Sequence, residues 1–286
     1  MPPAPLTLRC ADLELSVDVA AGGRATALRF EGVELLGGRT DDPVEHGMYA
    51  MGPWAGRLHE NQLRLDGRQW PMPVNYQGWA LHGTVLERPW VVLGLAQEAD
   101  HAWLAITTDL GQAWPWRGSM ELTWSLHRSV VRTRVSVRAH DSEFPAVIGM
   151  HPWFRKRTEF GQATWELPGG EIATKDAHYA LTGQLQSPPE RPGAFDDSFR
   201  VLDRRARVSW GTELTLDIHQ SHSWFVVYDA DRDYLCIEPQ TGPPNGINPG
   251  PFGPVTMVSP GTPLSQQTAW TFNRGQRADP ASLELN

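Results

Sequence analysis

Hydrophobic and polar residues alternate with a period of two along much of the chain. Such a segment has one apolar face and one polar face, which is the pattern of a β-strand buried on one side. The alternation is clearest at residues 13–19, 120–126, 131–137 and 214–218. Each of these four segments is predicted to form a half-buried strand.

Turn-forming residues separate the predicted strands. Asp66 and Gly67 follow Leu63 and Leu65 and precede a further alternating segment, which is typical of a tight β-hairpin. Residues 127–129 are expected to join another strand pair, and Trp270 and Phe272 to lie in a packed last strand.

Helices are expected to be few and short. No stretch places apolar residues at helical spacing over three turns, and 27 glycines and 24 prolines interrupt the chain at short intervals. Many strands without intervening helical segments favour packed antiparallel sheets over a parallel βαβ arrangement. The predicted fold is all-β, a large antiparallel β-sandwich.

A single domain is expected to span residues 1–286. The proline-rich residues 187–193 are interpreted as a surface loop, because strand patterning resumes soon after them. Residues from about 274 to 286 lose the alternation, which predicts a frayed terminus.

The composition narrows the range of partners. The chain carries 33 acidic and 25 basic residues, a formal charge of −8, with no stripe of Lys and Arg, so nucleic acid is not an expected partner. The N-terminus lacks the pattern of an export signal, and no apolar stretch is long enough to span a membrane. We expect a cytoplasmic protein, either a monomer or a homodimer.

Cysteine and tryptophan usage adds two points. Cys10 and Cys236 are the only cysteines, and both are expected to be reduced. Tryptophan occurs 13 times. Most of these side chains should lie in the core, but a surplus of aromatic residues also suits a cleft that binds the C–H faces of sugar rings.

Five ionisable residues lie beside aromatic residues and turn formers, where functional groups are often placed. They are Arg57, His82, His151, Asp196 and Glu238. Singly, Arg57 is most simply a surface residue, each histidine structural and Asp196 part of a turn. Glu238 ends an apolar strand, and partial burial there would raise its pKa and suit a general base. Neither histidine has a second ligand at short spacing, so no metal site is expected.

Together and in this order, the segments resemble the aldose 1-epimerase (galactose mutarotase) family over most of the chain. The similarity lies in Gly56-Arg57-Leu58 ahead of the hairpin, His82-Gly83, His151-Pro-Trp-Phe154, Asp196 to Phe199, and Glu238-Pro-Gln240 followed by proline and asparagine. The pattern is closer to a bacterial branch of the family.

The resemblance implies a galactose mutarotase-like supersandwich and an isomerase that needs no cofactor and no metal. His151 would be the general acid that protonates the ring oxygen, and Glu238 the base that accepts the proton of the anomeric hydroxyl. Arg57, His82 and Asp196 would bind hydroxyls, and Trp153 and Phe154 would line the cleft of a small-molecule sugar substrate.

Two departures from the family bear on recognition of the sugar. Gly56 stands where the family has asparagine, and Pro53 and Trp54 stand where many members have an arginine and an aromatic residue. These positions affect substrate recognition more than the acid/base pair.

Three other functions stay open at this point. A hexose-6-phosphate 1-epimerase would need cations at the cleft mouth, which Arg155 and Arg157 could supply. A non-catalytic carbohydrate-binding sandwich would use the aromatic residues and Arg57. A glycoside hydrolase would need a second carboxylate beside Glu238, and Asp196 is the candidate.

Overall fold

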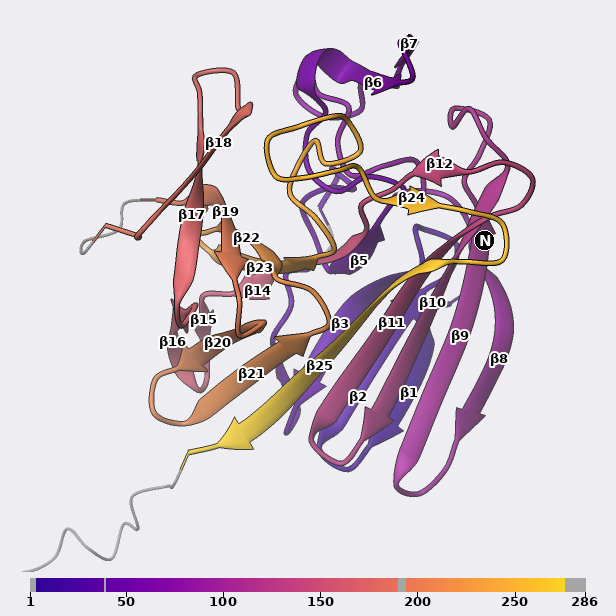
Figure 1. Cartoon of the computed structure of the whole chain (residues 1–286). Helices are drawn as coiled ribbons and strands as arrows, with labels where there is room; N and C mark the ends of the chain where they lie inside the picture. Colours follow the sequence, from indigo (N-terminus) through magenta and orange to yellow (C-terminus); the bar gives the residue numbers. More distant parts are fainter. Residues whose placement is uncertain (1–3, 39, 190–193, 276–286) are drawn as a thin grey trace, which may run out of the picture.

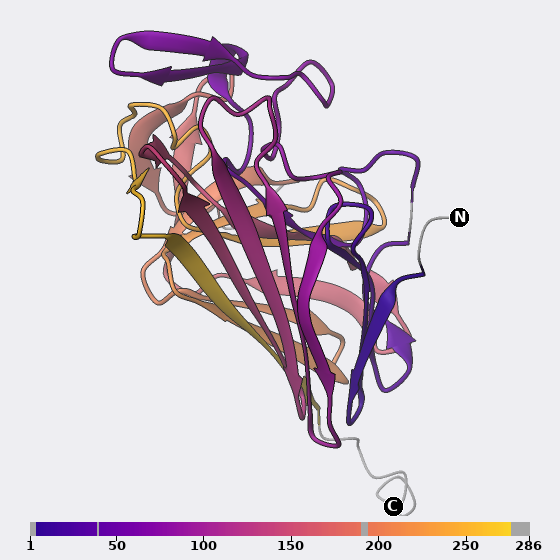
Figure 2. The same ribbon diagram turned by 90° about the vertical axis from the view of Figure 1, so that its right-hand side faces the viewer.

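The computed structural model describes residues 4–38, 40–189 and 194–275. Within these ranges two large sheets face each other, and every ladder between strands is antiparallel (Figures 1 and 2). The predicted antiparallel sandwich is therefore confirmed. The predicted frayed terminus lies outside the described residues from position 276 onward, as do positions 190–193 of the predicted loop.

The larger sheet has twelve strands in the described part of the chain. Its main path runs through β1 (Leu6–Cys10), β2 (Leu13–Asp18), β3 (Arg24–Phe30), β5 (Met48–Met51), β13 (Gly149–Pro152), β23 (Tyr234–Gln240), β22 (Trp224–Tyr228), β19 (Asp196–Val201), β17 (Gly170–Lys175) and β18 (Leu181–Gln186). Two short strands join it at the side, β4 (Val33–Glu34) beside β3 and β14 (Phe154–Arg155) beside β23.

The second sheet has nine strands among the described residues. In spatial order they are β15 (Arg157–Thr158), β16 (Gly161–Glu166), β20 (Arg205–Trp210), β21 (Leu214–Gln220), β25 (Leu264–Arg274), β11 (Val130–Ala139), β10 (Gly118–His127), β9 (His101–Asp109) and β8 (Val91–Gln97). Two small sheets complete the fold, β6 (Gln62–Leu65) with β7 (Arg68–Pro71), and β12 (Phe144–Pro145) with β24 (Met257–Val258).

The four predicted strands correspond to β2, β10, β11 and β21, with only Val19 lying beyond the end of β2, and the predicted last strand corresponds to β25. Asp66 and Gly67 form the turn of the β6–β7 hairpin, and residues 127–129 join β10 to β11, as predicted. In the described chain the one helical element is the short 3₁₀ turn η1 (His59–Asn61). No described helix has the length and apolar character needed to cross a bilayer.

The core lies between the inward faces of the two sheets. Trp124 of β10 and Trp270 of β25 are fully buried there, and the ring of Phe154 packs against the ring of Trp270 with centroids 6.1 Å apart. Both cysteines are free and buried, in agreement with the prediction. The core therefore draws its volume from alternate residues of the strands that the sequence pattern identifies.

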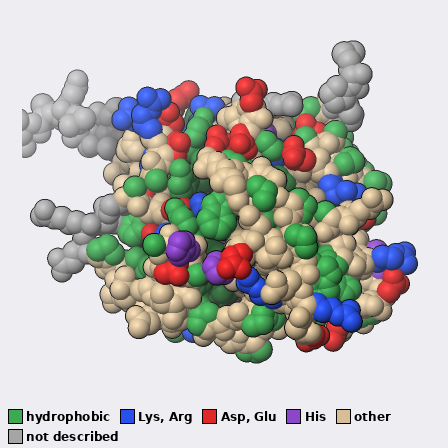
Figure 3. Space-filling view, turned by 90° about the horizontal axis from the view of Figure 1, so that it is seen from above, with side chains coloured by type: hydrophobic (Ala, Val, Ile, Leu, Met, Phe, Trp, Pro, Cys, Tyr) green, Lys and Arg blue, Asp and Glu red, His purple; other side chains and the backbone are tan. Residues whose placement is uncertain are grey.

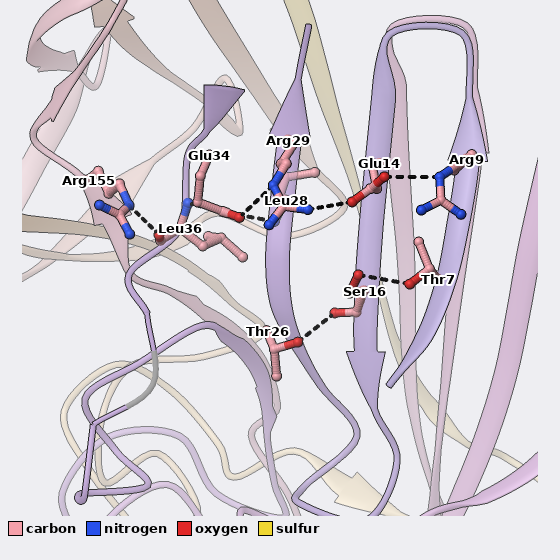
Figure 4. Close-up of polar contacts among 10 residues, drawn as sticks. All are labelled: Thr7, Arg9, Glu14, Ser16, Thr26, Leu28, Arg29, Glu34, Leu36 and Arg155. Atoms are coloured by element: carbon pink, nitrogen blue, oxygen red, sulfur yellow. Dashed lines mark hydrogen bonds and ion pairs between the residues drawn. The ribbon is translucent and has the colours of Figure 1, made fainter. Parts of the chain in front are cut away.

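The solvent face of β1 to β4 carries charged residues that pair across neighbouring strands (Figure 4). Glu14 lies between Arg9 and Arg29, and Arg29 also contacts Glu34 at 3.3 Å. Exposed pairs of this kind contribute little to stability. They give this face of the larger sheet a polar surface.

Candidate functional site

One cavity collects most of the predicted site residues. It has a volume of about 290 Å³ and is lined by Arg57, His82, His151, Trp153, Asp196 and Glu238, together with other side chains. It opens where the β17–β18 hairpin and the loops before β6 and after β23 gather (Figure 1). Figure 3 views this end from above, where hydrophobic, acidic and histidine side chains surround a hollow.

Strand register places the central residues. Gly149 pairs with Gln240, and Phe154 pairs with Leu235, so the same register sets His151 opposite Glu238. On β22, Val226 pairs with Glu238 in turn. His151, Glu238 and Val226 thus form one row across three strands. Because alternate residues of a strand point to opposite faces, the side chains of this row lie on the cavity side of the larger sheet.

His151 and Glu238 form a buried pair in this row. His151 Nε2 lies 3.2 Å from Glu238 Oε1, and the two side chains are only 5% and 4% exposed. Gln240 donates a hydrogen bond of 3.1 Å to the other carboxyl oxygen, Oε2. The carboxyl group is thereby oriented so that Oε1 faces the imidazole ring.

Burial shifts both pKa values in the direction that favours neutral groups. It lowers the pKa of His151 to about 3, with a further contribution from the Arg24 charge. Burial also raises the pKa of Glu238 well above its ordinary value, aided by the Asp196 charge and opposed by Gln240 and Arg57. The two opposite shifts favour a neutral imidazole and a protonated carboxyl, so the proton that the pair shares lies on Glu238.

Aromatic rings hold the His151 imidazole on both faces. The ring of Tyr49 stacks on it with centroids 4.9 Å apart, and the ring of Trp153 does so with centroids 5.4 Å apart. Trp153 is itself anchored, because its Nε1 donates a 2.7 Å hydrogen bond to the Val44 carbonyl. Trp153 thus lines the cavity, and Tyr49 is a contact that no motif indicated.

His82 is held by backbone geometry. It has a positive φ of 57°, and Gly83, which follows it, approaches Gly52 so closely that a Cβ there would lie 1.8 Å from the Gly52 carbonyl oxygen. The Gly56 amide donates a 3.2 Å hydrogen bond to His82 Nδ1. Nδ1 is therefore the acceptor in the neutral ring, and the proton lies on Nε2.

Burial also lowers the pKa of His82 well below its ordinary value, with contributions from His151 and Arg57. A neutral ring protonated at Nε2 can donate a hydrogen bond but carries no charge. The rings of His82 and His151 meet edge to face with centroids 4.9 Å apart. His82 therefore brings a fixed donor next to the His151–Glu238 pair.

Arg57 and Asp196 meet across the cavity although 139 positions separate them. Arg57 Nη2 lies 3.0 Å from Asp196 Oδ2, and Nη1 donates to Oδ1 at 3.4 Å, so both arms of the guanidinium engage the carboxylate. The guanidinium also lies 4.6 Å from the centroid of the Tyr179 ring. Arg57 is thereby fixed in orientation, although the two side chains remain 29% and 27% exposed.

A second ion pair lies beside the first. Lys175 Nζ contacts Asp197 Oδ1 at 3.0 Å and donates to the Asp196 carbonyl. Lys175 and Tyr179 line the cavity, and sequence reasoning missed both. No local pattern identifies them, because they reach the cavity only through the pairing of β17 with β19.

Phe154 corrects one prediction. It does not line the cavity but packs in the core, with its ring 5.9 Å from Trp210 and 6.1 Å from Trp270. The reason is parity: Phe154 follows Trp153 directly in extended chain, so the two side chains point to opposite faces of the sheet. The cleft aromatic of this segment is Trp153 alone.

Arg155 and Arg157, the cations considered for a phosphate, also lie away from the cavity lining. Arg155 Nε donates a 2.8 Å hydrogen bond to the Leu36 carbonyl (Figure 4). Arg157 Nε donates to the Gln162 side chain at 3.0 Å on an exposed surface. The cations that do line the cavity are Arg57 and Lys175, and both are paired with carboxylates.

Comparison with known proteins agrees with this geometry. The profile of the aldose 1-epimerase family matches residues 19–271, which is most of the chain. The chain belongs to the aldose 1-epimerase family. Membership of this family indicates an epimerase that acts on carbohydrates.

Relatives of this family member are distant in sequence but close in fold. The uncharacterized protein YihR of Escherichia coli is 22% identical over 81% of this chain and 82% of its own length. A galactose mutarotase-like protein from Clostridium acetobutylicum superposes with a TM-score of 0.82 at 16% identity, covering 94% of each chain. Galactose 1-epimerase from Lactobacillus acidophilus gives 0.78 at 13% identity, covering 95% of each.

Two departures of this chain from the family pattern have local explanations. Gly56 has a φ of +75°, and a Cβ at this position would lie 2.8 Å from Pro244 Cβ. Trp54 is buried, with its ring 6.0 Å from Trp114 and its Nε1 donating to the Ala80 carbonyl at 3.3 Å. Trp54 is therefore a core residue. A glycine at position 56 leaves room for Pro244 in the loop after β23.

Proposed function

We propose that the protein is a mutarotase, which interconverts the α and β anomers of a free hexose by opening and reclosing the ring. The observation that carries the proposal is the approach of His151 Nε2 to Glu238 Oε1 at 3.2 Å in a buried row of the sheet. Ring opening requires one group to take the proton of the anomeric hydroxyl and another to protonate the ring oxygen. A buried carboxyl and imidazole that share one proton supply both.

In this proposal Glu238 is the base and His151 is the acid. The free pair carries its proton on Glu238, so the proton moves to His151 when the sugar enters. Sugar hydroxyls that fill the cavity solvate the charged carboxylate and imidazolium, which offsets part of the burial that disfavours them. Rotation about the C1–C2 bond then presents the other carbonyl face, and reversed proton transfers close the opposite anomer.

The cavity suits one sugar ring. Its volume of about 290 Å³ is at the lower end for small-molecule sites. Trp153 offers an apolar surface for the C–H face of the ring, while Arg57, Asp196 and the His82 Nε2 hydrogen offer donors and acceptors to hydroxyls. Phe154 has no part in this arrangement.

A free sugar is favoured over a sugar phosphate. Each cation at the cavity is already paired, Arg57 with Asp196 and Lys175 with Asp197. A phosphate would have to displace a carboxylate or lie beside it, and Glu238 adds a further acidic group. This balance of charge suits a neutral ligand.

The proposal is tested by following freshly dissolved α-D-glucose and α-D-galactose toward anomeric equilibrium by polarimetry or proton NMR. The wild type should accelerate the approach, and His151→Ala and Glu238→Gln should each lose about 10² to 10⁴ in rate. Glu121→Gln is a matched control, because Glu121 lies on β10 of the other sheet and pairs with Arg138.

Each outcome bears on a different part of the proposal. Loss in both site variants with full activity in Glu121→Gln supports the acid/base pair. Acceleration that survives Glu238→Gln would remove Glu238 as the base. A wild type that binds sugars without accelerating exchange would support a carbohydrate-binding module instead.

A further inference from the structure

We infer that the floor of the cavity is a binding site for a divalent transition-metal ion of the Zn²⁺ type, held by His151, Cys236 and Glu238. The ligand atoms of these three buried residues lie within 4.8 Å of one another. It is the one such group in the part of the chain that the structure describes. Binding of the metal does not depend on the proposed function, whereas the inhibition that it would cause does.

Strand pairing explains why the three residues converge. Glu238 and Cys236 are two positions apart on β23 and therefore share the cavity face of the sheet. The register that sets His151 opposite Glu238 also sets Trp153 opposite Cys236. Sequence spacing did not reveal the site, because His151 lies on a different strand, far from the other two ligands in the chain.

The separations suit a tetrahedral ion after a small adjustment. Ligand atoms around a tetrahedral Zn²⁺ lie about 3.5 Å apart, given metal–ligand bonds of about 2.0 to 2.3 Å. His151 Nε2 and Glu238 Oε1 are already 3.2 Å apart. The third ligand atom, Cys236 Sγ, lies no more than 4.8 Å from a ring nitrogen of His151 and from a carboxyl oxygen of Glu238, so a shift of about one ångström would bring it to the tetrahedral spacing.

Two aromatic residues flank the thiol of Cys236. Cys236 is fully buried, with Tyr228 opposite it on β22 and Trp153 opposite it in the segment between β13 and β14. The rings of Trp153 and Tyr228 contact each other with centroids 5.7 Å apart. Because His151 and Glu238 line the cavity and Cys236 does not, an ion would enter between His151 and Glu238, with its fourth position facing the cavity.

The ligand set defines the class of metal. One imidazole nitrogen, one thiolate and one carboxylate suit Zn²⁺ or Co²⁺, whereas Mg²⁺ and Ca²⁺ prefer oxygen ligands alone. Binding releases two protons to solvent, one from the Cys236 thiol and one from the His151–Glu238 pair, because the ligands are a thiolate, a carboxylate and a neutral imidazole. A bound ion would occupy the atoms that the proposed mechanism uses, and it would therefore compete with the sugar.

The test is titration of the reduced full-length protein with Co²⁺. A thiolate bound to Co²⁺ gives a charge-transfer absorption in the near ultraviolet, and tetrahedral Co²⁺ gives intense visible bands. The wild type should develop both, and one equivalent of Zn²⁺ should abolish them. Cys236→Ala should lose the charge-transfer band, and its apparent Kd for Co²⁺ should rise at least about tenfold.

Cys10→Ser is the matched control, since Cys10 is also buried but lies outside this group of ligands, and its sulfur hydrogen-bonds the Asp100 carbonyl at 3.1 Å and the Arg128 amide at 3.2 Å. It should keep the wild-type spectrum. If Cys236→Ala does not fold, judged by circular dichroism, Cys236→Ser and His151→Gln take its place. Absence of the band in the wild type, or its persistence without Cys236, would overturn the inference.

Anomer exchange with added Zn²⁺ is then measured separately. Zn²⁺ should slow exchange by the wild type and by Cys10→Ser, and the effect should weaken as the sugar concentration rises. An inactive protein that still shows the Co²⁺ spectrum would count against the proposed function alone. An active protein without the spectrum would count against the metal site alone.

Discussion

The phenol ring of Tyr49 stacks on the imidazole ring of His151, with centroids 4.9 Å apart and planes inclined by 18°. The two residues are direct partners in the pairing of β5 with β13, and the Tyr49 hydroxyl donates a 2.9 Å hydrogen bond to the Val44 carbonyl. His151 Nδ1 has no hydrogen-bond partner among the described residues. Packing, more than hydrogen bonding, therefore orients the proposed acid.

This stack predicts a positioning role for Tyr49. Tyr49→Leu should lower kcat up to about tenfold, because a stacked pair is worth about 0.5 to 1.5 kcal/mol, with little change in KM. Tyr49→Phe keeps the ring and should retain most of the activity. Steady-state anomer exchange measures both, and equal losses in the two variants would assign the role to the hydroxyl.

The fork between Arg57 and Asp196 predicts an effect on sugar binding. Arg57→Lys keeps the charge but loses the two-armed contact, so KM should rise about tenfold with kcat nearly unchanged. Arg138→Lys on the outer face of β11, where Arg138 pairs with Glu121, serves as the control and should match the wild type. A fall in kcat alone would contradict this role.

The shifted pKa values predict an unusual dependence of stability on pH. The ordinary values are 4.5 for Glu238 and 6.5 for His151. Between them the unfolded chain holds one proton on histidine and the folded chain holds one on Glu238, so the pair adds no slope there. As the pH falls below about 4.5, the pair makes the protein less stable, because the unfolded chain then holds two protons and the folded chain one. As the pH rises above about 6.5, the pair again makes the protein less stable, because the unfolded chain holds no proton while the folded chain keeps one.

Replacing either residue alone should make stability depend on pH between about pH 4.5 and 6.5. Burial and Arg24, not Glu238, lower the pKa of His151 to about 3, so Glu238→Gln keeps that shift. Relative to the wild type, Glu238→Gln should lose stability as the pH falls from about 6.5 to 4.5. His151→Gln should lose stability, relative to the wild type, as the pH rises over the same range, because the folded carboxyl keeps its proton. Thermal midpoints measure both, and parallel curves would contradict the shifts.

Gly56 and Gly67 allow the cost of a left-handed backbone to be separated from the cost of a steric contact. Gly56 and Gly67 both have a φ of +75°, but a Cβ at Gly67 meets nothing within 4 Å, whereas one at Gly56 lies 2.8 Å from Pro244 Cβ. Gly67→Ala should cost about 1 to 2 kcal/mol for the left-handed conformation. Gly56→Ala should cost about 1 to 3 kcal/mol more for the overpacked contact. Urea unfolding compares them, and equal losses would mean that Pro244 moves aside.

Much of the fold follows from the alternation in the sequence. The segments with the clearest period of two became β2, β10, β11 and β21, because one apolar face per strand is what a sandwich buries. Asp66 and Gly67 marked their hairpin because the turn needs positive φ, which both residues adopt, at 49° and 75°. Local chemistry was sufficient in these places.

The site was predictable only in part, because pairing of distant strands assembles it. His82, His151, Trp153 and Glu238 stood out beside turn formers, but Tyr49 lies in a uniformly buried strand with no sign of its function. Phe154 was assigned to the cleft although it is one position from Trp153, and the parity of an extended chain sends it to the core. The same parity brings Cys236 beside Glu238.

The register of β13 against β23 also limits how the gene can change. Inserting or deleting one codon within β23 would exchange the faces of its residues, sending Glu238 into the core and turning Ile237 or Pro239 toward the cavity. The same change within β13 would turn His151 away from the cavity. The loops over the cavity carry no such restriction, since their lengths do not alter which strand residues face one another. Differences in the ligand that fits the cavity should therefore arise through those loops, whereas a one-residue insertion or deletion in either strand would remove the site.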